Sequence, residues 1–305
     1  MRKLLKLITF ILLLYVLYIN IDLLKSSFID FKKTDIKDII YTENINDITL
    51  NADPINDDTK LNQGLSGNTV YVDSDFYIYY TFLSENEKVV YRQIYANADK
   101  LNTTFIPESD IYENNLEKTL KAFYFDHPEF FWLGTEFSYK YDETNLIKEV
   151  TLGFNDTINY IEEAKNNFNN VVNSIVNEAN SLPNIIDKEK FVHDKIINLV
   201  EYDTASMLNQ SAYSALVLNR SVCAGYAKAF QCIMTKLGIP TYYVTGYSEG
   251  DHAWNMVNLG GHYYNVDVTW DDAAMNKYKF FNKSDNEFSS DHTRNNDGLL
   301  LPSCA

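Results

Sequence analysis

The sequence contains few cysteines, few basic residues and little glycine or proline for its length. Its 305 residues include three cysteines, Cys223, Cys232 and Cys304, and their spacing contains no C-x-x-C or paired Cys/His motif of a structural zinc site. Lys and Arg number 26 against 42 Asp and Glu, and this net charge of −16 argues against a nucleic-acid partner, because phosphate binding needs basic patches. With 11 glycines and six prolines, the chain is not of low complexity.

Among the three cysteines, we consider one possible intramolecular disulfide. Cys223 and Cys232 lie nine residues apart on one predicted helix, on opposite faces and about 13 Å apart along its axis, so they cannot pair. A disulfide between Cys232 and Cys304 stays open at this stage. The alternative is that both are unpaired structural thiols.

The N-terminus carries the one long apolar run. Residues 1–24 begin M-R-K-L-L-K and continue with a nearly unbroken apolar segment from Leu7 to Ile21, with no small-x-small cleavage site after it. We predict a signal anchor, with the basic end cytoplasmic and the rest of the chain extracytoplasmic in a single-pass arrangement. The alternative is a signal peptide that is cleaved to release a secreted protein.

The remaining sequence predicts an α+β protein in three parts. Residues 25–69 are polar and predict a mostly irregular tether. Residues 70–155 predict a small α+β domain, and residues 156–305 predict a second, catalytic domain. In the small domain we expect a strand at 70–80, a helix opened by the capping box Ser84–Glu87 and ending near 101, a helix at 107–125, and a hairpin of strands 135–141 and 146–154.

The second domain begins with helices and ends with strands. We expect helices at 157–179 and 187–200, a third helix that starts after Ser221, and strands at 241–247, 252–259 and 262–268. His193 on the second of these helices has no evident partner nearby in sequence, and His127 precedes a proline. We interpret His127 as structural and do not expect His193 to be catalytic.

Cys223 is placed where a thiol becomes reactive. Ser221 is a good N-cap residue, which puts Cys223 in the first turn of its helix. The unpaired N–H groups and the helix dipole there stabilise a thiolate and can also hold an oxyanion. Gly225 allows another backbone or a substrate to approach closely. Cys232, in mid-helix between apolar neighbours, fits a structural thiol instead.

A histidine and an aspartate are predicted to meet on the two strands that follow. If Leu259 pairs with His262 across the Gly-Gly turn, Asp267 lies opposite Trp254, and His252 lies two residues along on the same face. His262 then points to the other face and is the weaker candidate for a base. The alternative is that His252 caps its strand and Asp267 forms a structural salt bridge.

Four segments resemble the core motifs of the bacterial transglutaminase-like superfamily. They are C-A-G-Y-A-K-A-F (223–230), G-I-P (238–240), H-A-W-N (252–255) and V-D-V-T-W-D-D (266–272), and the likeness extends over about residues 185–272. The resemblance implies a papain-like transglutaminase core, in which a cysteine helix packs on an antiparallel sheet. It also implies that Cys223 is the nucleophile, His252 the base and Asp267 the group that orients it.

The same resemblance suggests two accessory residues and a reaction class. Tyr202 would be a second oxyanion donor, and Trp254 would shape and shield the cleft. We expect a thiol enzyme that acts on peptide or carboxamide bonds through a thioester, by hydrolysis as a peptidase or amidase or by transamidation. This chemistry requires no cofactor or metal. The expected substrate is a protein or peptide, and the predicted location favours one from the cell envelope.

Two rival hypotheses are retained. The domain could be catalytically idle and serve a cell-surface binding or scaffolding protein through recognition alone. Alternatively, Cys223 and His252 could bind zinc, which predicts stoichiometric metal on purification. The oligomeric state does not follow from the sequence.

Overall fold

The computed structural model describes residues 48–56, 58–155 and 158–305. The described residues form one compact unit. The predicted signal anchor, residues 1–24, lies outside them. In the part of the chain that the structure describes, no helix is long and apolar enough to cross a membrane. The proposed domain boundary at residue 155 stays a prediction.

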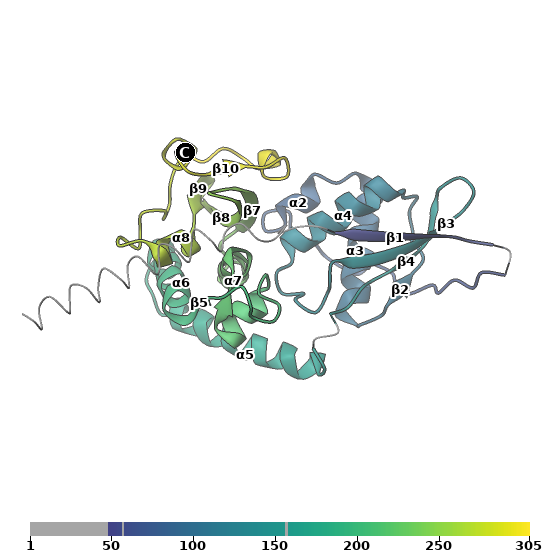
Figure 1. Ribbon diagram of the computed structural model, residues 1–305, viewed down its shortest axis with the longest axis horizontal. Helices are drawn as coiled ribbons and strands as arrows, with labels where there is room; N and C mark the ends of the chain where they lie inside the picture. Colours follow the sequence, from purple (N-terminus) through teal and green to yellow (C-terminus); the bar gives the residue numbers. More distant parts are fainter. Residues whose placement is uncertain (1–47, 57, 156–157) are drawn as a thin grey trace, which may run out of the picture. The chain divides into compact units, whose positions relative to one another are not determined.

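Residues up to 155 build a small mixed sheet with helices packed against it (Figure 1). Strands β3 (Glu136–Tyr141) and β4 (Ile147–Thr151) form the predicted hairpin, and the strand order is β1-β3-β4-β2. The other elements are β1 (Thr49–Pro54), α2 (Ile78–Thr81), α3 (Glu85–Asp99), β2 (Thr104–Phe105) and α4 (Glu113–Asp126).

Local signals predicted some of these elements well and others poorly. The capping box of Ser84 and Glu87 is present at the start of α3, which confirms that prediction. The tether prediction is wrong at residues 49–54, which form β1 parallel to β3. The strand predicted at 70–80 is also wrong, because its end folds as α2: the Asp126 carboxylate accepts hydrogen bonds from the backbone N–H groups of Tyr79 and Tyr80. Helix α4 begins at Glu113, six residues later than predicted.

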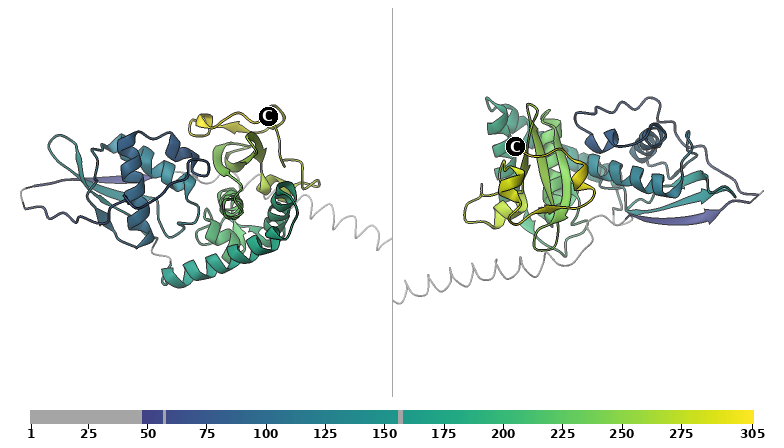
Figure 2. Two further views of the ribbon diagram at one scale, coloured as in Figure 1. Left: turned by 180° about the vertical axis from the view of Figure 1, so that it is seen from behind. Right: turned by 90° about the horizontal axis from the view of Figure 1, so that it is seen from above.

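Residues from 158 on place one buried helix between a sheet and two further helices (Figure 2). Helix α7 (Cys223–Lys236) packs on β7 and β8 on one side and on α5 and α6 on the other. The antiparallel sheet has the order β10-β7-β8-β9. The elements are α5 (Ile161–Asn180), α6 (Ile185–Leu199), β5 (Glu201–Tyr202), the π-helix η1 (Ser214–Leu218), β6 (Arg220–Ser221), α7, β7 (Thr241–Tyr247), β8 (Asp251–Leu259), β9 (His262–Val266), α8 (Val268–Ala273), α9 (Asp285–Phe288), β10 (Thr293–Arg294) and the 3₁₀ turn η2 (Gly298–Leu300).

The β8–β9 hairpin has the predicted register. Leu259 pairs with His262 and Asn255 with Val266, and both turn glycines, Gly260 and Gly261, have positive φ. The strand predicted at 262–268 is two residues too long, since β9 ends at Val266. Asp267 is the N-cap of α8, and its side chain accepts a hydrogen bond from the Trp270 backbone N–H.

One hydrophobic core runs through both halves of this unit. The Tyr79 hydroxyl donates to the carbonyl of Tyr243 at 2.7 Å, and the Gln231 side chain donates to the carbonyl of Phe125 at 2.9 Å. Helix α7 is therefore held from several sides, which fixes the position of the cysteine at its start.

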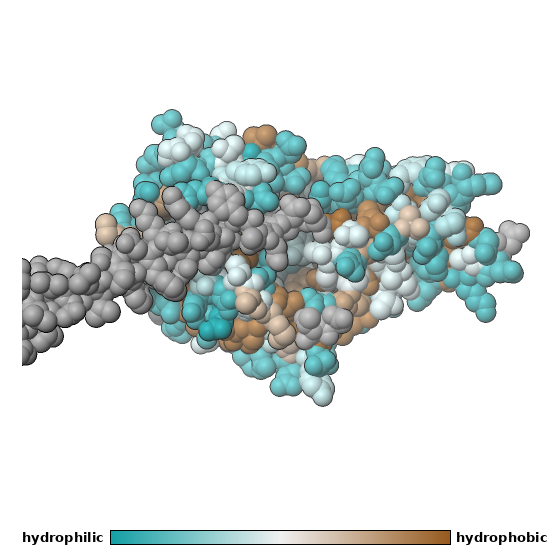
Figure 3. All heavy atoms as spheres, viewed as in Figure 1, coloured by the Kyte–Doolittle hydropathy of each residue, from teal (hydrophilic) through white to brown (hydrophobic). Residues whose placement is uncertain are grey.

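Polar side chains cover much of the face drawn in Figure 3, and apolar side chains are exposed in patches between them.

Candidate active site

Cys223 lies in the first turn of α7, as the sequence predicts, but Ser221 does not cap the helix. The N-cap is Val222, which offers no side-chain cap, and the Ser221 hydroxyl donates to the carbonyl of Asn209 instead. The N-cap prediction is wrong because the preceding loop competes for that hydroxyl. Cys223 still lies in the first turn, where the helix dipole favours a thiolate.

Gly225 allows the loop before η1 to pack directly on the first turn of α7. A Cβ at this position would lie 1.8 Å from the Ser221 hydroxyl oxygen, 2.8 Å from the Ser211 carbonyl oxygen and 2.9 Å from that of Asn209. The close approach that the sequence predicts is therefore made by another backbone. It anchors the helix start that carries Cys223.

His252 lies between Cys223 and Asp267. It is buried on β8, and its Nε2 is 2.6 Å from Oδ2 of Asp267. Burial by itself lowers the pKa of His252, but the Asp267 carboxylate and the Cys223 thiol outweigh it and raise that pKa to about 10. The Nδ1 atom has no hydrogen-bond partner among the described residues. The raised pKa keeps the His252 ring protonated at neutral pH.

Asp267 receives hydrogen bonds on both carboxylate oxygens. Oδ1 accepts from the Trp270 backbone N–H at 3.0 Å, and Oδ2 is shared by His252 and His292. Burial by itself raises the pKa of Asp267, but the histidines outweigh burial and hold that pKa well below its usual range. This carboxylate therefore stays ionised although it is fully buried.

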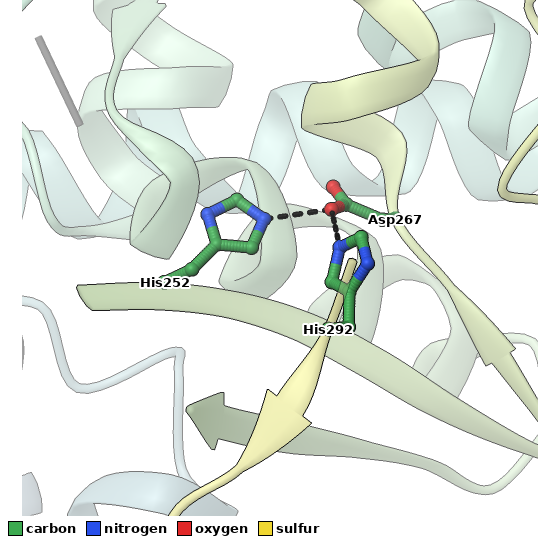
Figure 4. Close-up of side chains that lie close together, drawn as sticks. All are labelled: His252, Asp267 and His292. Carbon is green, nitrogen blue, oxygen red and sulfur yellow. Dashed lines mark hydrogen bonds and ion pairs between the residues drawn. The ribbon is translucent and has the colours of Figure 1, made fainter. Parts of the chain in front are cut away.

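His292 is a site residue that the sequence analysis missed. It follows α9, and Figure 4 shows its ring below Asp267, directed at the same carboxylate oxygen as the ring of His252. Its Nε2 lies 2.9 Å from Asp267 Oδ2, its Nδ1 lies 3.0 Å from Asp291 Oδ1, and its ring centroid is 4.0 Å from that of Phe288. The only sequence signal was the rarity of histidine, since D-H-T-R carries no motif.

His252, Asp267 and His292 also form a set of donors that a metal ion could use. One ligand atom from each lies within 4.8 Å of the others. Both Nε2 atoms, however, are at hydrogen-bond distance from the same carboxylate oxygen. A metal ion bound here would have to displace both of these hydrogen bonds, including the Nε2 proton that joins His252 to Asp267.

Tyr202 lies next to Cys223, and Trp254 lies next to His252. Burial, and to a smaller extent the neighbouring Cys223 thiol, raises the pKa of Tyr202 well above its usual range. The Tyr202 hydroxyl therefore remains a hydrogen-bond donor beside Cys223. Trp254 is buried rather than exposed at a cleft surface. Its ring stacks on that of His252 with centroids 6.1 Å apart, and its N–H donates to Asn265 Oδ1. Trp254 therefore supports the imidazole from within the core.

The remaining histidines and cysteines lie elsewhere. His262 is exposed, as the predicted register requires, and His127 is buried among aromatic rings. The expectation that His193 has no partner nearby in sequence is wrong, because its Nδ1 bonds to Asp194 while its Nε2 bonds to Asp271. Cys232 and Cys304 are free thiols like Cys223, so the alternative of a disulfide between them is not realised.

A family match covers the segment that contains most of this site. Residues 169–268 match the model of the transglutaminase-like superfamily. The chain carries a transglutaminase-like domain. This domain includes Cys223, His252 and Asp267, whereas His292 lies beyond the matched segment. Its mixed helices and antiparallel sheet agree with the α+β core that the resemblance implies.

Similar proteins share only part of their length with this chain. Human kyphoscoliosis peptidase is 30% identical over 107 residues, which are 28% of this chain and 16% of that protein. A solved structure of a TGase is 17% identical with a TM-score of 0.33, over 54% of this chain and 50% of that one. The periplasmic domain of TgpA from Pseudomonas aeruginosa is 11% identical with a TM-score of 0.30, over 45% of this chain and 63% of that one. Structural likeness of this size identifies no reaction.

Proposed function

We propose that this protein is a membrane-anchored, extracytoplasmic thiol enzyme that acts on peptide or carboxamide bonds through Cys223, His252 and Asp267. The observation that carries the proposal is the position of His252, which bonds to a buried, ionised Asp267 on one side and lies beside the Cys223 thiol on the other. These are the parts of a nucleophile, a base and an orienting carboxylate.

The first half-reaction forms a thioester. The Cys223 thiolate adds to the substrate carbonyl carbon, and N–H groups at the start of α7 together with the Tyr202 hydroxyl stabilise the oxyanion. The imidazolium of His252 then gives its proton to the leaving nitrogen, the C–N bond breaks and an amine departs. Asp267 keeps the ring oriented and stabilises its charge throughout.

The second half-reaction sets the outcome. In hydrolysis, His252 takes a proton from water as the water attacks the thioester carbonyl carbon, and a carboxylic acid is released. In transamidation, His252 takes a proton from an amine that attacks the same carbon, and a new amide forms. In either case the Cys223 thiolate is regenerated. The location rests on residues 1–24, whose basic end and apolar run favour an anchor with the body outside, and the peptide or protein substrate rests on the transglutaminase-like resemblance.

Thiol reactivity tests the proposal. The full chain, its Cys223→Ala variant and its His252→Ala variant would be treated with iodoacetamide from pH ~5 to ~9, and labelling mapped by mass spectrometry. Cys232 and Cys304 are internal controls, because burial raises the pKa of Cys304 to about 12 and that of Cys232 further still. We expect labelling of Cys223 near pH ~6 that depends on His252.

The opposite result would favour a binding or scaffolding protein. If Cys223 reacts only as pH approaches the ordinary thiol pKa of about 8.5, and His252→Ala changes nothing, then the thiol is not activated. A label on Cys223 that is lost with His252 would instead justify a search for substrates. That search would compare release of acid with transfer to an added amine.

A further inference from the structure

A cavity lies beside α7 at Lys228. It measures about 250 Å³ and is lined by aromatic residues of α4 and the loop after it, including Tyr124, Phe130 and Phe131, by residues 208–211, and by Lys228 of α7. Ligand sites usually occupy ~300–1,000 Å³, so this cavity suits a small group. Cys223, His252 and Asp267 do not line it.

Lys228 is a basic side chain that lines this cavity and has no counter-charge among the residues that the structure describes. Its exposure is 3%, and it makes no hydrogen bond or ion pair with any described residue. Its Nζ lies 3.6 Å from the centroid of the Tyr124 ring and 5.3 Å from that of Tyr243. No Asp or Glu is among the described residues that line the cavity. An unpaired buried cation is costly, and two aromatic faces offset only part of that cost.

The burial of Lys228 and the charges around it determine its protonation. Burial lowers its pKa well below the usual range. The other titratable side chains that line the cavity are Tyr124 and His127. Neither carries a negative charge at neutral pH, because burial raises the pKa of Tyr124 to about 12 and an imidazole ring is not an anion there. A bound anion would favour the ammonium form and draw a proton onto the amine.

His127 adds a second polar group to the same cavity wall. Its Nδ1 lies 2.8 Å from Oε1 of Glu129, while its Nε2 has no hydrogen-bond partner among the described residues. We assign the single proton of the neutral ring to Nδ1, which faces the Glu129 carboxylate, and Nε2 in this tautomer accepts a hydrogen bond. A ligand that fits would bring one negative charge, one N–H donor and an apolar body.

We propose that this cavity binds a small N-acylated amino acid or the C-terminal residue of a peptide, with its carboxylate paired to Lys228. The apolar side chain packs against Phe130 and Phe131, and the amide N–H is available to His127. Both ligands share this chemistry. The site is additional to the proposed thiol reaction, because it requires neither Cys223 nor His252.

Calorimetry with matched probes tests this site. N-acetyl-leucine and N-acetyl-leucinamide differ only in the charged group, and both would be titrated into the full chain at pH ~8 in two buffers of different ionisation enthalpy. We expect saturable binding of the acid, at least tenfold weaker binding of the amide, and uptake of a proton with the acid alone. Lys228→Met should abolish the preference, whereas Lys236→Met, an exposed lysine on the same helix, should retain it.

Several results would overturn the proposal. They are equal binding of acid and amide, unchanged acid binding in Lys228→Met, or no saturable binding of the acid up to 10 mM. If Lys228→Met fails to fold, the acid–amide comparison and the proton uptake of the unmodified chain still decide. N-acetyl-Ala-Ala-Leu separates the two ligand sources: binding at least as tight as that of N-acetyl-leucine assigns the site to peptide C-termini, and weaker binding assigns it to free N-acyl amino acids.

Discussion

His252 and His292 bond to the same oxygen of Asp267. Nε2 of His252 lies 2.6 Å from Oδ2 and Nε2 of His292 lies 2.9 Å from it, one from β8 and the other from the segment after α9. The carboxylate that would orient the base is therefore held by a second ring. This arrangement makes Asp267 a rigid partner, and the first three predictions follow from it.

Replacement of Asp267 by Asn should lower the rate of the proposed reaction strongly while the fold persists. The amide has almost the shape of the carboxylate but lacks its charge, so it no longer stabilises the imidazolium of His252. By analogy with catalytic triads, the loss should be on the order of 10³–10⁴ in turnover. A less stabilised imidazolium also supports less thiolate at Cys223, so the first measurement is the alkylation rate of Cys223, together with circular dichroism of the variant. A rate within about twofold of the unmodified chain would exclude Asp267 as the orienting group.

His292→Phe should weaken the site without removing any group that touches substrate. Phe keeps the ring that packs on Phe288 but removes the hydrogen bond to Asp267. By analogy with the outer partners that orient metal-ligating histidines, we expect the loss of this bond to lower activity about 10–100-fold. Because the bond from His292 helps to lower the pKa of Asp267, the acid limb of the Cys223 alkylation profile should move to higher pH.

The matched control is His262→Phe. His262 is exposed on β9, so this change should leave the alkylation profile in place. If His292 has a purely structural role, His292→Phe should lower the stability of the protein. The pH profile of Cys223 alkylation should then stay unchanged in the molecules that remain folded.

The charged form of His252 should contribute to stability in a defined pH window. Its pKa is raised to about 10, above the ordinary value of about 6.5, so the folded state binds the extra proton more tightly than the unfolded chain. The contribution is complete below pH ~6.5 and is lost as pH rises towards 10. Urea unfolding of the chain and of His252→Gln should show a free-energy difference that shrinks across this window. A difference that grows with pH would contradict the raised pKa.

Glu189→Gln should stabilise the protein above neutral pH. Glu189 on α6 is fully buried, accepts one hydrogen bond from the Asn282 side chain, and has a pKa that burial raises to about 7. Because the folded state favours the protonated acid, stability falls as pH rises from ~4.5 to ~7. Gln removes this cost, and we expect a gain of about 1–3 kcal/mol at pH ~8.

The same substitution should have little effect at pH ~4, where Glu189 is already protonated. Unfolding in urea at both pH values measures the difference. An equal gain at both would mean that packing, rather than the buried charge, controls this position.

Gly225→Ala should destabilise the start of α7 despite the higher helix propensity of alanine. The propensity gain is about 1 kcal/mol. The new Cβ, however, would meet the Ser221 hydroxyl and two backbone carbonyl oxygens that cannot move independently. We expect a net loss of about 1–3 kcal/mol, measured by thermal unfolding. Ser221→Ala in the same chain should restore part of it, because it removes only the closest contact.

Much of the site could be predicted because its signals are local. Cys223 in a helix first turn, the Gly-Gly turn and the strand register depend on short stretches of sequence, and the register fixes that His252 and Asp267 meet. The capping box of Ser84 and Glu87 is local in the same sense. The roles of the three triad residues in catalysis stay predictions until thiol reactivity is measured.

The errors arose where a distant group competes with a local preference. Ser221 is a good N-cap residue, but the carbonyl of Asn209, twelve residues earlier, takes its hydroxyl. Residues 78–81 suit a strand, but the carboxylate of Asp126 binds their N–H groups and favours a turn of helix. These outcomes depend on free-energy differences of about 1–2 kcal/mol, which tertiary contacts easily exceed.

By itself the sequence determined the α+β class, the cysteine at a helix start and the face shared by His252 and Asp267. These depend on hydrophobic periodicity and turn chemistry, which act over a few residues. Only the tertiary structure brought His292 to Asp267 across 25 residues and placed Lys228 in an aromatic cavity with no ion-pair partner among the described residues. Such contacts arise from how whole elements pack, and no local pattern in the chain encodes which side chains then become neighbours.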